Sequence, residues 1–189
     1  MKRRIFKPLG LAMSLTLLLA CFVATPKEAA AQAASMRREA QSALETLYET
    51  TPAAKALGKD AVGILVFPSI VKGGFIFGGQ YGKGTLFKGG NKTEYYKSTA
   101  VSYGLQAGAQ KFGYALFFMT KDDLDYLERS SGWEVGVGPS IVILDAGMAA
   151  STTTTTAKKG VYAFFFNQKG LMAGLGLQGT KITRIYPVE

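Results

Sequence analysis

Histidine is absent from the sequence, and the only cysteine, Cys21, lies near the N-terminus. A Cys/His metal site, a Cys–His nucleophile and a disulfide within the chain are therefore excluded. Acidic residues are also few: 13 Asp and Glu stand against 22 Lys and Arg, and the formal charge is +9. These absences leave little room for catalysis, and we expect neither a cofactor nor a metal.

One cluster of acidic residues stands at the start of a short segment with helical periodicity. Asp122, Asp123 and Asp125 follow Thr120. A threonine hydroxyl caps helix N-termini, and carboxylates in the first turn interact favourably with the helix dipole. No matched base or nucleophile accompanies these acids. We therefore predict a short helix over residues 121–130 and a protein that is not an enzyme.

Residues 1–31 have the pattern of a secretory signal: a basic start, an apolar run over residues 9–23 that is short for a membrane span, and a small-residue cleavage site at residues 29–31. A second interpretation is a lipoprotein signal, because the motif LLAC ends at Cys21, which would then be acylated. A twin-arginine signal is also partly matched at residues 3–6. All three predict an exported, periplasmic protein, and the second adds a membrane anchor.

Residues 32–189 are expected to form a single domain. Residues 1–31 contain five of the Lys and Arg residues and one Glu, which leaves a formal charge of +5 for the rest of the chain. This moderate positive charge suits attraction to an anionic surface and does not argue for nucleic acid.

Apolar residues recur at helical spacing between positions 35 and 57, with Ser35 as the expected N-cap and an interruption before Pro52. The stripe consists of Met36, Ala40, Ala43, Leu44, Leu47 and Tyr48. Such a helix either packs on the protein core or lies on a membrane surface, with Arg37 and Arg38 near lipid. Interspersed glutamates favour packing.

The remainder of the chain has the alternation and glycine turns of β-structure. A buried run over residues 64–67 stops at Pro68, and a second follows at residues 75–77. Residues 101–110 alternate as one strand, with residues 114–119 as its expected hairpin partner. The fold class is therefore α+β and mainly antiparallel β: a small glycine-rich barrel or sandwich with an N-terminal amphipathic helix and one short helix.

Glycine is frequent in these expected strands, which implies that something approaches the backbone closely. Gly78-x-Gln80-x-Gly82 and Gly104-x-Gln106-x-Gly108 are two copies of one pattern, with glutamine between glycines on one strand face. Either the layers pack tightly over glycine, or a shallow polar groove admits a headgroup that bonds Gln80 and Gln106.

Lysines are concentrated between residues 55 and 97. Among them we expect Lys72, Lys83, Lys88 and Lys92 to contact phosphates, each near-surface lysine contributing about 1 kcal/mol at an anionic bilayer. Tyr81 and Phe87 would then lie at the membrane interface. Solvated lysines in ordinary turns are the alternative explanation.

The ordered pieces of this β region resemble the SYLF family, which in yeast relatives is described as an actin-binding domain. They are residues 63–68 (GILVFP), 73–84, 104–110, 136–139 and 161–179. The resemblance implies a non-enzymatic module that binds lipid, with phosphoinositide membranes as partners of eukaryotic members and actin as a partner of some. Bacterial members are typically exported proteins.

We therefore predict binding of anionic lipid, through phosphoinositide-type or phospholipid headgroups, at a membrane surface. The alternative is a structural or protein-interaction module of the bacterial cell envelope, with an envelope protein as partner. Actin is an improbable partner for an exported protein, and nucleic acid is not expected.

Overall fold

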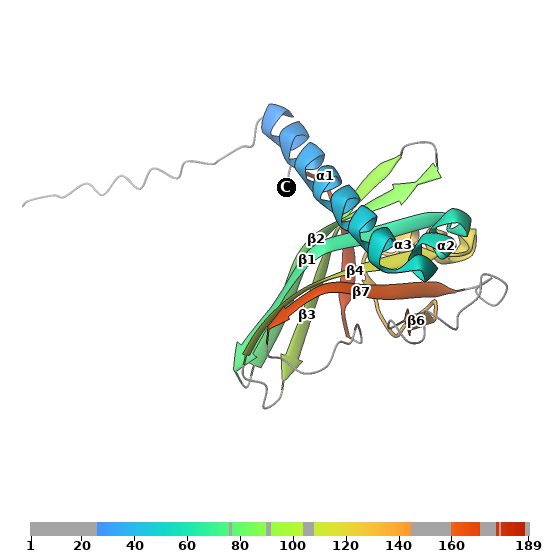
Figure 1. Ribbon diagram of the computed structural model, residues 1–189. Coiled ribbons are helices and arrows are strands. Elements are labelled where there is room, and N and C mark those ends of the chain that lie inside the picture. The colour runs from blue at the N-terminus through green and yellow to red at the C-terminus, as the bar shows by residue number, and fades with distance from the viewer. Residues whose placement is uncertain are drawn as a thin grey trace, which may run out of the picture.

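The structure is a computed structural model, and it describes residues 26–75, 77–89, 92–103, 108–144, 160–170, 177 and 179–187. Three helices and eight strands lie in this part of the chain (Figure 1). The helices are α1 (Pro26–Thr50), α2 (Pro52–Asp60) and α3 (Lys121–Arg129). The strands are β1 (Gly63–Phe75), β2 (Phe77–Lys88), β3 (Thr93–Tyr103), β4 (Gly108–Phe118), β5 (Trp133–Glu134), β6 (Ile141–Leu144), β7 (Val161–Gly170) and β8 (Lys181–Ile185).

All eight strands form one sheet in the order β5-β8-β3-β2-β1-β4-β7-β6. Every neighbouring pair is antiparallel except β6 and β7, which are parallel. The sheet curls into a half-barrel that α1 crosses diagonally (Figure 1). This confirms the α+β, mainly antiparallel prediction, and the curled sheet is the form that the expected barrel or sandwich takes.

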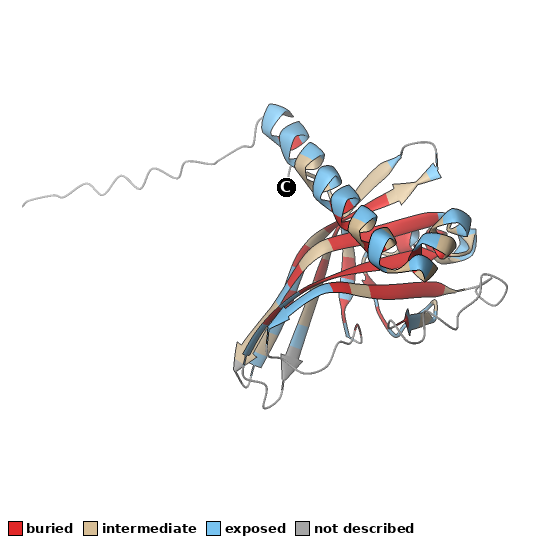
Figure 2. Ribbon diagram, in the orientation of Figure 1, coloured by how far each residue is buried: buried red, intermediate tan, exposed pale blue. Residues whose placement is uncertain are grey.

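The two faces of the sheet bury different partners. The inner face packs against α3 and the segment after it, through Leu124, Leu127 and Trp133. The outer face packs against α1 and α2, through residues such as Leu47 and Leu57. Buried residues concentrate under α1, and exposed residues mark the strand ends that project past it (Figure 2). Helix α1 therefore covers only part of the outer face.

Helix α1 begins at Pro26 and runs through Ser35, so the expected start and N-cap at Ser35 were wrong. The Ser35 hydroxyl instead donates to the Glu39 carboxylate at 2.8 Å, one turn further along. The interruption before Pro52 is confirmed, because α1 ends at Thr50 and α2 begins at Pro52. Ala40, Ala43 and Leu47 of the apolar stripe are buried on the sheet and Leu44 and Tyr48 pack beside them, as expected for a packed helix. None of the three described helices is long and apolar enough to cross a membrane.

Two strand boundaries differ from the sequence prediction. Strand β1 continues through Pro68, because the register shifts there and the extra residue is accommodated as a bulge. Residues 101–110 are not one strand: β3 ends at Tyr103 and β4 begins at Gly108. The two are separated by β2 and β1, so the expected hairpin with residues 114–119 was also wrong. Apolar and small or polar residues alternate on both β3 and β4, so the alternation does not show where β3 ends.

Candidate functional site: the uncovered part of the outer face

The four lysines predicted to contact phosphates do not share a face. Lys72 is on the inner face of β1, opposite Gln80 and Gln110 in the two neighbouring strands. Lys83 is on the outer face of β2, and Lys92 precedes β3 at the far end of the sheet. Lys88 and Lys92 border one hollow, but the carboxylates of Asp125 and Glu128 border it too. The roles of the four lysines in lipid binding stay predictions, and their placement supports no site common to all four.

Lys88 is held within the protein by two carboxylates. Its Nζ lies 2.5 Å from Glu94 Oε1 and 2.8 Å from Glu128 Oε1. Burial alone would lower the pKa of Lys88, but the hydrogen bonds to Glu128 and Glu94 raise it above its ordinary value. Burial acts to raise the pKa of Glu94, yet its bonds with Lys88 and Tyr96 lower it. Lys88 therefore ties β2 and β3 to α3.

Gln80 is buried on the inner face, and its Nε2 donates to Ser98 Oγ at 3.5 Å. The same Ser98 oxygen accepts a hydrogen bond from the Tyr114 hydroxyl at 2.8 Å. Nearby, neither amide atom of buried Gln110 has a hydrogen-bond partner within the described part of the chain. The position of Gln80 agrees with the packing interpretation of its glycine–glutamine pattern. The second predicted glutamine, Gln106, lies outside the described residues, as does Cys21.

The two aromatic residues predicted at the interface have different environments. Phe87 is half-buried and packs against the core under α1. Tyr81 is 50% exposed on the outer face, beyond the part that α1 covers. Only Tyr81 is therefore placed to contact a partner.

Around Tyr81 the outer face exposes four large apolar side chains, which we call the outer patch. They are Val71 at 57%, Phe77 at 70%, Tyr81 at 50% and Val101 at 89% exposed. Val71 is directly opposite Tyr81 across β1 and β2, and Val101 is opposite Gly79 across β3 and β2. Soluble proteins seldom gather such side chains on one surface without a partner.

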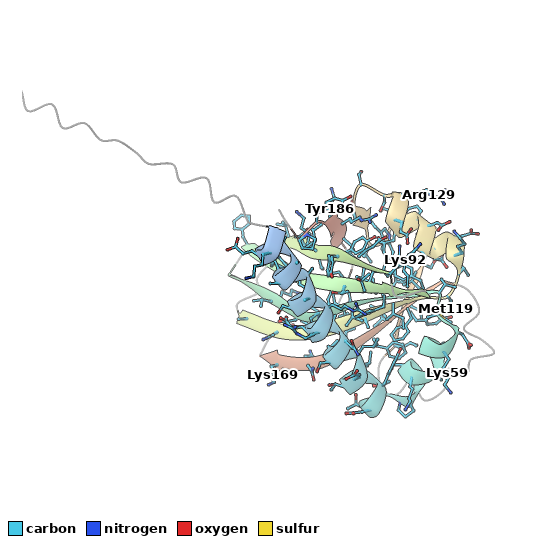
Figure 3. All side chains as sticks on the ribbon, turned by 90° about the horizontal axis from the view of Figure 1, so that it is seen from above. Lys59, Lys92, Met119, Arg129, Lys169 and Tyr186 are labelled. Atoms are coloured by element: carbon cyan, nitrogen blue, oxygen red, sulfur yellow. The ribbon has the colours of Figure 1, made fainter. Side chains whose placement is uncertain are left out.

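Lysines flank the outer patch on two sides. Lys83 and Lys97 are opposite each other across β2 and β3, and Lys111 and Lys169 are opposite each other across β4 and β7. No carboxylate among the described residues lies on the outer face of strands β1 to β4 and β7. Lys169 and the predicted Lys92 lie on opposite sides of α1 (Figure 3). Sequence reasoning counted Lys97 in the lysine-rich stretch without selecting it, and it missed Lys111 and Lys169, because only the strand register brings these lysines to one face.

The surroundings of the glycines in β2 show what approaches their backbone. A Cβ added to Gly84 would meet Phe67 Cδ1 at 2.6 Å, and one added to Gly82 would meet Ile70 Cδ1 at 2.4 Å. The side chains of β1 therefore pack directly against these inner-face glycines. On the outer face, a Cβ on Gly79 would have its nearest neighbour at 3.9 Å. Gly79, beside the outer patch, is therefore open to a partner.

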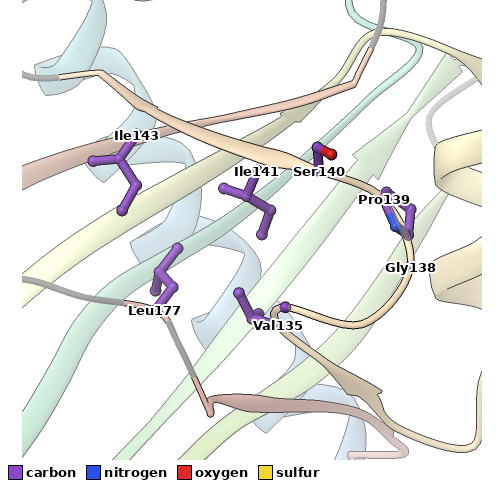
Figure 4. Close-up of a pocket in the computed structure, with 8 residues that line it drawn as sticks. Val135, Gly138, Pro139, Ser140, Ile141, Ile143 and Leu177 are labelled. Carbon is purple, nitrogen blue, oxygen red and sulfur yellow. The ribbon is translucent and has the colours of Figure 1, made fainter.

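A separate apolar hollow of about 440 Å³ lies on the other side of the sheet (Figure 4). The side chains of Ile141, Ile143 and Leu177 line it, together with the loop through Pro139. Among the residues that the structure describes, no charged side chain borders this hollow.

The predicted acid cluster serves the start of α3. The Thr120 hydroxyl accepts a hydrogen bond from the Asp123 backbone N–H at 3.2 Å, which confirms the predicted cap. The Asp123 carboxylate accepts from the Gly160 N–H at 3.2 Å, and Asp125 pairs with Lys121 at 2.9 Å. Within the described ranges no group of His, Cys, Asp and Glu is placed to hold a metal ion. The acids are used structurally.

The structure combines an exposed apolar surface flanked by lysines with an acid cluster on α3 that caps the helix and pairs locally, and this arrangement is typical of a binding module. More specifically, residues 99–185 match the model of the Ysc84 family, described as Las17-binding protein actin regulator. The match confirms the resemblance to the SYLF family over these residues, and that family consists of binding domains rather than enzymes. At a coarse level, the match indicates lipid-related or actin-related binding. No curated protein matches the chain.

Proposed function

We propose that this protein binds the surface of an anionic membrane through the outer patch and the lysines that flank it. The observation that carries the proposal is the exposure of Val71, Tyr81 and Val101 on a face whose charged strand residues are lysines. Apolar and aromatic side chains insert at the level of the headgroups, while each lysine near the surface attracts anionic lipid by about 1 kcal/mol.

For an exported chain, as the leader predicts, the anionic surface would be phospholipid of the cell envelope. The acidic side of α3 faces away from such a membrane, because α3 packs on the inner face of the sheet. This separation of lysines on the outer face from acids on the inner side supports docking by the outer face only.

The first test is co-sedimentation of the chain from Pro26 onward with vesicles of phosphatidylcholine alone, or mixed with phosphatidylglycerol, across a salt series. All described core residues lie between Ala29 and Ile182, so this chain retains both hydrophobic cores. We expect binding to the anionic vesicles only, and weaker binding as salt rises, because surface charges are screened.

Two matched variants distinguish the contribution of the lysines that flank the outer patch from that of the overall positive charge. Replacing Lys83, Lys97, Lys111 and Lys169 by Gln should abolish binding. Replacing four exposed lysines elsewhere, Lys55, Lys59, Lys92 and Lys121, removes the same charge and should largely preserve it. Equal loss in both would show attraction without a defined face, and no binding by the unmodified chain would favour a protein partner at the outer patch.

A further inference from the structure

A hollow lined by polar side chains lies at one side of the outer patch, where the bulged strands β1 and β7 flank β4. Between Val66 and Ser69, β1 advances three residues while β2 advances two. Between Phe166 and Lys169, β7 likewise advances three while β4 advances two. Bulges recur beside functional sites because they redirect side chains and interrupt strand pairing.

The hollow between these bulges has a volume of about 360 Å³. It is lined by Pro68, Ser69, Lys111, Phe112, Asn167 and Lys169. Asn167 is the one non-glycine residue of the described chain with a left-handed backbone, at φ 53°, and its side chain is exposed. A left-handed backbone costs conformational energy for any residue other than glycine, although asparagine tolerates it better than most. The bulge at Asn167 is therefore maintained against local strain.

Two like charges face each other across this hollow. Lys111 and Lys169 are directly opposite in the β4–β7 register, and neither ammonium has an ion pair or hydrogen bond with any described residue. Like charges in this position destabilise a sheet, because their side chains are within about 5.5 Å at Cβ. An anion seated between them would remove the repulsion.

A second hollow of about 470 Å³ adjoins the first, since Pro68 and Asn167 line both. Its other wall is the edge of α1, with Arg38 and Glu39. Arg38 thus places a third cation on the wall of the adjoining hollow, where a ligand larger than one phosphate would extend. The Glu39 carboxylate on the same wall accepts the Ser35 hydroxyl and keeps its negative charge.

We propose that the hollow formed by Ser69, Lys111, Asn167 and Lys169 is a specific site for a phosphate monoester, as presented by the headgroup of a membrane lipid. A monoester carries a charge near −2 at neutral pH, which matches two lysines, whereas a phosphodiester carries only −1. Hydroxyl and amide groups of Ser69 and Asn167 supply further bonds to its oxygens. This inference rests on the proposed membrane binding and specifies the headgroup.

The test compares vesicles containing phosphatidic acid, a monoester, with vesicles containing phosphatidylglycerol, a diester, at equal measured zeta potential. The unmodified chain from Pro26 onward should prefer phosphatidic acid by about tenfold, the increment expected for one additional charge-assisted contact at the weak end of the range. Lys111→Gln with Lys169→Gln should reduce that preference to about one. Lys83→Gln with Lys97→Gln removes an equivalent opposed pair and should retain it.

Asn167→Gly keeps the backbone conformation and removes the amide, so it should lower the preference without unfolding the protein. Soluble glycerol 3-phosphate, added in a thermal unfolding experiment, distinguishes the source of the phosphate. If it raises the Tm of the unmodified chain but not of the Lys111/Lys169 variant, while vesicles show no preference, the site stands and takes a soluble phosphate monoester.

The proposal is overturned if neither phosphatidic acid nor glycerol 3-phosphate is recognised, or if both lysine pairs contribute equally to the preference. Binding to phosphatidylglycerol would persist in those outcomes if the general membrane function is right. Failure of the specific site is therefore distinguishable from failure of the proposed function.

Discussion

Individual lysines of this protein have roles that their positions in the sequence do not reveal. Lys88 and Lys92 are four residues apart, yet Lys88 lies among Glu94, Glu128 and buried side chains whereas Lys92 is exposed. The same residue type is a structural cation in one case and a solvated one in the other, because β2 carries Lys88 toward α3.

Replacing Lys88 by Met should destabilise the protein by about 1–3 kcal/mol, because Glu128 loses its counterion and Glu94 loses the nearer of its two cations while it keeps Arg184. Lys92→Met is the matched control and should change the free energy of unfolding by less than about 0.5 kcal/mol. Urea unfolding at neutral pH measures both. Similar values for the two variants would contradict the structural role of Lys88.

The stability of the protein should depend on pH through Glu94. Its pKa in the folded protein is lower than in the unfolded chain, where it is about 4.3. The stabilisation is therefore fully present above about pH 5 and is lost as the pH falls through the folded-state pKa. Glu94→Gln should be less stable than the unmodified protein at pH 7, and the difference should shrink toward pH 3. A difference that is constant from pH 7 to pH 3 would argue against this assignment.

At the scale of elements, β2 shows how glycine serves two faces of one strand. Gly82 and Gly84 admit the side chains of β1 on the inner face, and Gly79 leaves the outer face bare. The tight curl of the sheet depends on the first two, since neighbouring side chains could not cross a strand that carried Cβ atoms there.

Gly84→Ala should therefore cost about 1–3 kcal/mol of stability, because the new Cβ would lie 2.7 Å from the Val66 carbonyl oxygen, which cannot move freely. Gly79→Ala, in the same strand, meets nothing closer than 3.9 Å and should be neutral or slightly stabilising. Chemical denaturation of the two variants makes the comparison. If both were equally harmful, glycine flexibility rather than close packing would explain the pattern.

The elements also explain which predictions were confirmed. The α3 helix was predicted from Thr120 and its acids because capping is a local interaction over three residues. The start of α1 was not predicted correctly, because a helix packed on a sheet can extend beyond the residue that would cap it best. The boundary between β3 and β4 was missed because alternation with period two does not show which strands become neighbours.

At the scale of the whole molecule, α1 divides the outer face into a covered core and an uncovered end. Ala40 and Leu47 of α1 pack over the strands on one side, while Val101 and Tyr81 remain exposed on the other. In the proposed function the uncovered end of the outer face meets the membrane, and α3 lies on the opposite side of the sheet. Docking should therefore occur in one orientation.

A single fluorophore tests that orientation. The chain from Pro26 onward has no cysteine, so Val101→Cys and Val137→Cys each provide one labelling site at an exposed position. An environment-sensitive dye at position 101 should shift its emission to the blue on phosphatidylglycerol vesicles, because it enters the interface. The dye at position 137, beside α3, should not respond. Equal shifts at both positions would rule out one-face docking.

Composition and local pattern determined which chemistry this protein lacks, its α+β class, the capped helix α3 and the resemblance that the family match confirms. The surface was decided only by tertiary structure. An uninterrupted pleat would place Lys72 on the same face as Ile64 and Val66, but the bulge at Pro68 reverses the alternation and turns Val71 outward instead. The bulge before Lys169 has the same effect in β7. Because one extra residue exchanges the two faces of a strand, the set of lysines that meets a partner depends on register, which no local pattern specifies.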